Sequence, residues 1–247
     1  MVSNAEKYHR ELLNEIKSHR RQLTKTDMKK LESYIGTNKI SYNIGAETEK
    51  KIVREWISKH SDISCGDFFL LLDLLYRGKS VNEISIAGSL LRRFPEFRRI
   101  LSLGKIYDWL DNLRGWAEVD SLCQSCFTAE EILARWDEWE RLLLKLARDE
   151  NIHRKRASLV LLTRATRESG DKRLSDLAFS NIDRLKENRE ILVTKAISWL
   201  LRDLTKNNRS QVQEYIRANE DTLPRIAIRE TRTKLLTGKK TPPRKRT

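Results

Sequence analysis

The sequence predicts an all-α protein built from antiparallel helix pairs. Apolar residues recur three and four positions apart through most of its 247 residues, which is the spacing of one buried helix face. No segment of five or more residues alternates apolar and polar side chains as a half-buried strand does. The chain has only nine glycines and four prolines, the residues that are common in loops. We therefore expect short connections between helices. Such pairs either close into a bundle or stack into a solenoid.

The first half of the chain contains a regular series of expected helices. Ser80 and Glu83 have the spacing of a capping box, which opens a helix that must stop near Pro95. The next helix is expected to run across residues 100–110 and to end at the break formed by Gly115 and Trp116. Earlier helices are expected at residues 8–16, 28–35, 52–57 and 68–75.

The second half continues this pattern. Thr128 and Glu131 have the spacing of a second capping box, and one helix is expected behind them across residues 132–146. Residues 151–156, Asn-Ile-His-Arg-Lys-Arg, lead into an apolar helix at 157–162. A basic first turn is unfavourable for the helix dipole, so its cations either face a partner or are simply solvated. Later helices are expected around residues 174–177, 191–204, 212–216 and 223–236.

Charge is the second strong signal. The chain carries 49 Lys and Arg against 35 Asp and Glu, a net charge of +14, and the excess is spread along its length. Such a charge is typical of proteins that bind a polyanion. A membrane anchor would also need an exposed apolar face, so the distribution favours a long nucleic-acid-binding surface.

No Ser/Gly-rich linker divides the chain, so we expect a single domain over residues 1–237. Residues 238–247 are rich in Lys, Arg and Pro and are expected to form a disordered basic tail. The polar N-terminus has no signal-peptide core, and the longest apolar run, residues 68–72, is too short to span a bilayer. We therefore expect an intracellular protein, cytoplasmic and nucleoid-associated, or nuclear in a eukaryote.

Three cysteines, an odd number, are typical of a reducing compartment with free thiols. Cys123 and Cys126 have the spacing of half a zinc site, but a closed site needs four ligands, and only Cys65 and four scattered histidines remain. We therefore expect no metal, and two half-buried thiols one helical turn apart.

The stretch that follows Gly115 carries the most specific chemical signal. Trp116 and Asp120 are four residues apart, so on a helix they share a face. An indole face attracts positive charge and a carboxylate stabilises it at closer range, so the two together suit a cationic ligand. From this stretch alone, a packed tryptophan and a solvated aspartate remain the simpler interpretation.

Singular residues recur at the period of a helical repeat. Arg156 follows Trp116 by 40 residues, Trp199 follows Arg156 by 43, and Tyr34 precedes Trp116 by 82, or twice 41. These spacings match the roughly 40 to 47 residues of HEAT-type repeats. Because equivalent positions of successive repeats lie on one ridge of a solenoid, the spacing predicts that these four side chains line one surface.

Four segments carry a resemblance to a known family. Residues 195–208, Lys-Ala-Ile-Ser-Trp-Leu-Leu-Arg-Asp-Leu-Thr-Lys-Asn-Asn, with residues 215–219, are similar to a Lys-Ala-Ile-Gly-Trp…Leu-Arg-Glu signature. Trp116 to Asp120 is similar to a Trp-x-x-x-Asp motif of this family, and residues 151–162 resemble its segment with an active-site arginine. Tyr34 sits where the family has a tyrosine ahead of its first long loop. The family is that of the AlkD-type DNA alkylation-repair glycosylases. The resemblance covers most of the chain and is weakest before about residue 30 and in the tail.

This resemblance implies a HEAT-like solenoid with a concave basic surface for DNA. It implies excision of cationic N3- and N7-alkylated purines from duplex DNA, with the lesion recognised from the backbone side. Asp120 would be the catalytic carboxylate, Tyr34, Trp116 and Trp199 would cradle the cationic nucleotide, and Arg156 would hold a nearby phosphate. No cofactor and no metal are implied. We expect a monomer whose partner is double-stranded DNA containing alkylated bases.

The sequence departs from the family pattern at several places. Ser198 replaces the usual Gly before the Trp, His153 stands where a Trp is common, and residues 37–44 lack the aromatic-rich pattern. The five candidate residues are retained. Some relatives bind DNA without excising bases, and helical repeats commonly serve as scaffolds. A catalytically silent binder of damaged or unusual DNA and a protein-interaction scaffold therefore remain as alternatives.

Overall fold

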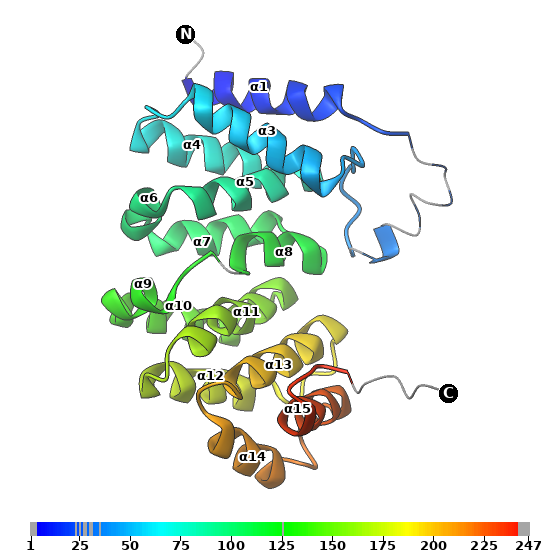
Figure 1. The fold of residues 1–247 in the computed structure, drawn as a ribbon, viewed down its shortest axis with the longest axis vertical. Helices are drawn as coiled ribbons and strands as arrows, with labels where there is room; N and C mark the ends of the chain where they lie inside the picture. The colour runs from blue at the N-terminus through cyan, green and yellow to red at the C-terminus, as the bar shows by residue number, and fades with distance from the viewer. Residues whose placement is uncertain are drawn as a thin grey trace. The chain divides into compact units, whose positions relative to one another are not determined.

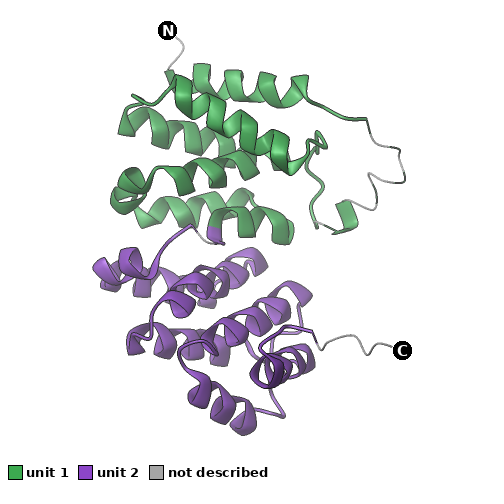
Figure 2. Ribbon diagram, viewed as in Figure 1, with its two compact units in different colours: residues 1–122 green, residues 123–247 purple. Residues whose placement is uncertain are grey.

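The computed structural model describes residues 4–22, 24, 26, 29, 32–34, 36–124 and 126–241. In these residues every regular element is a helix (Figure 1). The one extended pairing among them is an isolated bridge between Ile40 and Ser80. The predicted all-α fold is therefore confirmed. By its internal contacts the chain divides into two compact units, residues 1–122 and residues 123–247 (Figure 2).

Unit 1 is built from helices that pack on near neighbours in the sequence. Helix α1 packs on α3 and α4, and α5 packs on the same two helices. Apolar side chains such as Leu12, Phe68 and Leu90 are completely buried between them. The elements are α1 (Asn4–Ser18), α3 (Ala46–Lys59), α4 (Cys65–Tyr76), α5 (Val81–Arg93), α6 (Pro95–Ile100), α7 (Leu103–Trp109), the 3-10 helix η1 (Leu110–Asn112) and α8 (Gly115–Cys123).

Unit 2 is organised around one central helix, α11. Every residue from 157 to 163 is buried, because α10 and α12 pack on α11 and so does α13. Helix α13 in turn packs on α15. Contacts between near neighbours in the sequence are the pattern of a helical-repeat fold. The helices are α9 (Ala129–Ala134), α10 (Trp136–Arg148), α11 (Ile152–Glu168), α12 (Lys172–Leu185), α13 (Ile191–Leu204), α14 (Arg209–Ala218) and α15 (Arg225–Thr237).

Both predicted capping boxes are confirmed. The Ser80 hydroxyl accepts from the backbone N–H of Glu83, whose side chain accepts from the backbone N–H of Ser80, so two otherwise orphaned donors at the start of α5 are paired. Thr128 and Glu131 make the same reciprocal bonds at the start of α9. Pro95 stands at the first position of α6, where its missing N–H costs no helical hydrogen bond.

Two expected helices are interrupted, and these predictions were wrong. Residues 100–110 do not form one helix: α6 ends at Ile100, Leu101 turns its buried side chain into the core, and Ser102 precedes α7. Residues 132–146 are divided at Arg135, where α9 ends and α10 begins. The Arg135 guanidinium makes two hydrogen bonds to the Glu138 carboxylate, at 3.0 and 2.6 Å, which ties the break to the first turn of α10.

Two predicted segments lie partly outside the described residues. In the helix expected at 28–35, Met28, Leu31 and Ile35 are outside them, whereas Tyr34 is helical. In the basic tail, residues 242–247 are outside them, and Gly238 caps α15 with a φ of 71°. No helix in the described parts of the chain has the length and apolarity that crossing a membrane requires.

Candidate functional site

Tyr34 and Trp116 form a pair in unit 1. Their rings lie edge to face with centroids 5.3 Å apart and planes at 83°. The indole N–H of Trp116, at the start of α8, donates to the backbone carbonyl of Tyr34 over 2.6 Å. Tyr34 is 69% exposed and Trp116 is half-buried, so the pair reaches solvent while its polar edge is already satisfied.

Asp120 lies one helical turn after Trp116 on α8, as the spacing predicts. The residue is 7% exposed, so its carboxylate is largely removed from water. Placed beside an aromatic surface and partly desolvated, such a carboxylate would stabilise a nearby positive charge more strongly than it would in bulk water.

Two glycines bring the segment after Tyr34 against the start of α8. Gly36 and Gly115 have φ values of 75° and 66°, a region that side chains disfavour. A Cβ added to Gly36 would lie 3.2 Å from the Cα of Gly115. Lys39, three residues further on, donates to the Glu118 carboxylate over 2.8 Å. The loop therefore approaches α8 closely beside Trp116.

Close packing also positions the other side of α8. A Cβ on Gly88 of α5 would lie 2.1 Å from the carbonyl oxygen of Ser121, so only glycine allows this approach. The Ser121 hydroxyl donates to the carbonyl of Ile84 over 3.0 Å, and Arg92 donates to the Ser121 carbonyl over 3.3 Å. Helix α8 is thus fixed to α5 at the residue next to Asp120.

Arg156 lies on α11 in unit 2 and is 4% exposed. One of its guanidinium nitrogens donates to the carbonyl of Leu192 in the first turn of α13 over 2.7 Å. Its neighbour Arg154 pairs with Asp149 at 3.1 Å, with both side chains largely buried. These two cations of the basic first turn are buried and have partners within the protein, so the alternative of a merely solvated turn was wrong for them. That they face an outside partner stays a prediction.

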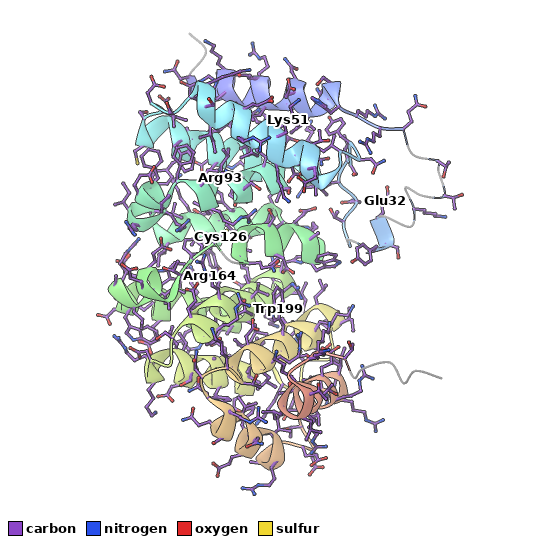
Figure 3. The ribbon with its side chains drawn as sticks, viewed as in Figure 1. Glu32, Lys51, Arg93, Cys126, Arg164 and Trp199 are labelled. Atoms are coloured by element: carbon purple, nitrogen blue, oxygen red, sulfur yellow. The ribbon has the colours of Figure 1, made fainter. Side chains whose placement is uncertain are left out.

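Trp199, labelled in Figure 3, lies on α13, which packs against the helix of Arg156. It is half-buried, and α13 carries the Asp203 carboxylate one helical turn later. Arg167 donates to the same carboxylate over 3.1 Å. Burial raises the pKa of the Asp203 carboxyl above its ordinary value, and Arg167 and Arg202 act against that rise. Trp199 and Asp203 thus repeat the spacing of Trp116 and Asp120.

The candidate residues fall into two groups, one in each unit. Unit 1 brings Tyr34, Trp116 and Asp120 together, and unit 2 places Arg156 and Trp199 on two packed helices. The convergence of all five side chains on one surface stays a prediction.

The two cysteines of the sequence motif are more deeply buried than expected. Cys123 is 2% exposed and Cys126 is fully buried, so the expectation of half-buried thiols was wrong. Among the described residues, no cluster of three or more His, Cys, Asp or Glu side chains is arranged to hold a metal ion.

Comparisons with known proteins identify the family of the chain. A family model described as DNA alkylation repair enzyme matches residues 12–235, which span both units. The chain belongs to the DNA alkylation repair enzyme family. Its structure is similar to that of a predicted DNA alkylation repair enzyme from Enterococcus faecalis, with a TM-score of 0.70 and 18% identity over 89% of this chain and 99% of that chain. At this identity the likeness concerns the fold alone. No curated protein matches the chain significantly.

A role in DNA alkylation repair follows from membership of this family. One departure from the motif of the DNA alkylation repair enzymes now has a physical explanation. Ser198 stands where a glycine was expected, and its hydroxyl donates to Glu230 on α15 over 2.7 Å. Arg202 lies 3.4 Å from the same Glu230 carboxylate. The serine therefore links α13 to α15 directly beside Trp199.

Three features near the candidate residues were missed from the sequence. They are the Lys39–Glu118 pair, the close approach at Gly88, and Asp203 beside Trp199. The first two join residues far apart in the chain, and no local pattern predicts them. Asp203 carried a usable signal, because it repeats the four-residue spacing from a tryptophan that singled out Asp120.

Proposed function

We propose that the chain is a monofunctional DNA glycosylase that excises cationic N3- or N7-alkylated purines from duplex DNA. The observation that supports this most is the pairing of Trp116 with Asp120: a half-buried indole whose N–H is already used, one turn before a largely buried carboxylate. The indole ring would contact the cationic base, and the carboxylate would stabilise positive charge on the sugar.

The chemistry needs one carboxylate. A purine alkylated at N3 or N7 is positively charged, so it leaves as a neutral base when the bond from C1′ to nitrogen breaks and the electron pair moves to that nitrogen. No general acid is then required. Asp120 would stabilise the oxocarbenium-like sugar and orient the water whose oxygen bonds to C1′, and the water proton passes to the carboxylate or to solvent.

The remaining candidates would bind rather than react. Tyr34, Trp116 and Trp199 would surround the cationic nucleotide, and each such contact contributes on the order of 0.5 to 2 kcal/mol. Arg156 would hold a phosphate, with its guanidinium already oriented by the carbonyl of Leu192 before DNA binds. The other basic residues would supply affinity that does not depend on sequence.

A base-release assay tests this proposal. Duplex DNA carrying 7-methylguanine is incubated with the protein, and free base is separated and measured over time. Release that rises with protein concentration and leaves an abasic strand supports a glycosylase. Binding without release of free base would identify a silent binder of damaged DNA, and absence of duplex binding at low salt would favour a scaffold.

A further inference from the structure

Lys39 and Glu118 form a buried ion pair between the two segments of unit 1 that carry Tyr34 and Trp116. The Lys39 ammonium donates to Glu118 over 2.8 Å, and the two side chains are 12% and 1% exposed. The same ammonium donates to the backbone carbonyl of Asn112, and the same carboxylate oxygen accepts from the backbone N–H of Arg114 over 2.8 Å. The pair therefore ties the loop after Tyr34 to the residues that lead into α8.

This pair is poorly suited to stabilising the fold. The second oxygen of Glu118 is buried and has no hydrogen-bond donor within the described part of the chain. Taking two charges out of water is costly unless every remaining polar atom is satisfied, and apolar residues of similar size often serve as well or better. What such a pair does supply is a defined position for the segments that carry its two charges.

The segments that it joins carry the candidate aromatic residues. Glu118 lies two positions after Trp116, about 200° around the helix, so it faces inward while Trp116 reaches solvent. Lys39 lies five positions after Tyr34, and between them Gly36 contacts Gly115. The hydrogen bond from Trp116 to the Tyr34 carbonyl depends on this segment staying in place.

We propose that Lys39 and Glu118 are positioning residues, which hold the Tyr34 segment against the start of α8 and so set the geometry of the Tyr34–Trp116 surface. The consequence of this positioning for catalysis rests on the proposed function, whereas the geometry of the Tyr34–Trp116 pair can be measured in the free protein. Lys39 and Glu118 would not contact the alkylated base themselves. They would act through the Tyr34 and Trp116 rings, which would contact it.

The experiment replaces the ion pair with an apolar pair, Lys39→Met with Glu118→Leu, so that neither charge is left buried alone. Glu118→Gln is the second variant, because it removes the charge but keeps an oxygen for Lys39 and for the Arg114 N–H. Lys105→Met is the matched control. It breaks another partly buried lysine pair of unit 1, with Asp73 at 2.6 Å, whose carboxylate also accepts from the Trp109 indole.

The readout is fluorine NMR of protein labelled with 5-fluorotryptophan. The chain has six tryptophans, and Trp116→Phe assigns the resonance of interest. We expect the double variant to stay folded and to shift or broaden the Trp116 resonance, whereas Lys105→Met should affect Trp109 and leave Trp116 unchanged. An unchanged Trp116 resonance in the folded double variant would overturn the proposal. If the double variant does not fold, Glu118→Gln replaces it: a shifted or broadened Trp116 resonance supports the proposal, and an unchanged one overturns it.

Single-turnover excision gives the functional arm. Because small displacements of positioned groups slow reactions strongly, we expect the double variant to excise 7-methylguanine about ten- to a hundredfold more slowly, with unchanged affinity for undamaged duplex. Wild-type excision by a folded double variant with a displaced Trp116 would support the positioning role but overturn its consequence for catalysis. If the wild-type protein releases no base, the proposed function fails, and the NMR arm still decides the positioning role.

Discussion

Trp116 donates its indole N–H to the backbone carbonyl of Tyr34 over 2.6 Å, although the two residues are 82 positions apart. The bond satisfies the polar edge of the indole within the protein, which leaves the ring faces for other contacts. The planes of the Tyr34 and Trp116 rings lie at 83° to each other, so the tyrosine ring covers only part of the indole surface. A cation placed against the free part of the Trp116 face would also lie near Asp120, one turn further along α8.

Replacing Trp116 by alanine should weaken recognition of the charged base. Loss of one cation–π contact costs about 1 to 2 kcal/mol, which corresponds to a kcat/KM for excision roughly 5 to 30 times lower. Trp136→Ala is the matched control, because Trp136 is also half-buried but carries Arg173 over its ring, at 5.4 Å, in unit 2. Steady-state excision kinetics compare the two, and equal losses in both variants would contradict a specific role for Trp116.

Gly88→Ala should destabilise unit 1, because the added Cβ would lie 2.1 Å from the Ser121 carbonyl oxygen. Overpacking of this kind costs about 1 to 3 kcal/mol and forces the backbone apart. Gly66→Ala on α4 is the comparison, since the nearest atom to its added Cβ would be 4.0 Å away. This substitution should raise the free energy of unfolding by about 0.4 to 1 kcal/mol. Chemical denaturation measures both, and a neutral Gly88→Ala would show that α5 and α8 can separate freely.

The elements with strong local signals were predictable, and those set by tertiary contact were not. The helix expected at residues 191–204 has those bounds in the structure, because its apolar spacing is unbroken. The break at Arg135, where the backbone leaves helical geometry at φ −127° and ψ 45°, was missed because the apolar spacing continues across it. At the candidate site, Trp116 and Asp120 could be paired from their spacing. Lys39 and Glu118, which are 79 positions apart, could not.

Binding to undamaged duplex should weaken steeply as salt is added. Each neutralised phosphate releases counterions, so the log–log slope changes by about 0.9 per contact and should reach several in magnitude. Deleting the residues after Thr237 removes five of the 49 Lys and Arg and should lower the slope only modestly. Fluorescence anisotropy across a salt series measures both proteins. A salt-insensitive affinity would favour the scaffold over any nucleic-acid binder.

Glu83→Gln should reduce the loss of the free energy of unfolding as the pH falls from 7 to acid values. Burial would raise the pKa of Glu83, but hydrogen bonds from His9 and Ser80 outweigh it and hold the pKa below its ordinary 4.5. A lowered folded pKa contributes stability above pH 4.5 that is lost as the pH falls through the folded pKa. Denaturation from pH 7 to pH 3 should therefore show less acid loss in the variant. Glu131→Gln makes the same change in the second capping box, so it shows how much of the effect comes from the loss of a capping carboxylate in general.

Asp120→Asn is the most direct test of the proposed chemistry, because it keeps the size and shape of the side chain but removes its charge. Removing an electrostatic stabiliser from a desolvated site costs about 3 to 4 kcal/mol, so excision of 7-methylguanine should slow about a hundred- to a thousandfold. Affinity for undamaged DNA should stay level or rise, since a carboxylate repels phosphates. Asp108→Asn is the control: it removes the same charge from an exposed position on α7 and should leave single-turnover excision unchanged. Wild-type excision by Asp120→Asn would mean that another group stabilises the sugar cation, and the mechanism proposed for this site would be wrong.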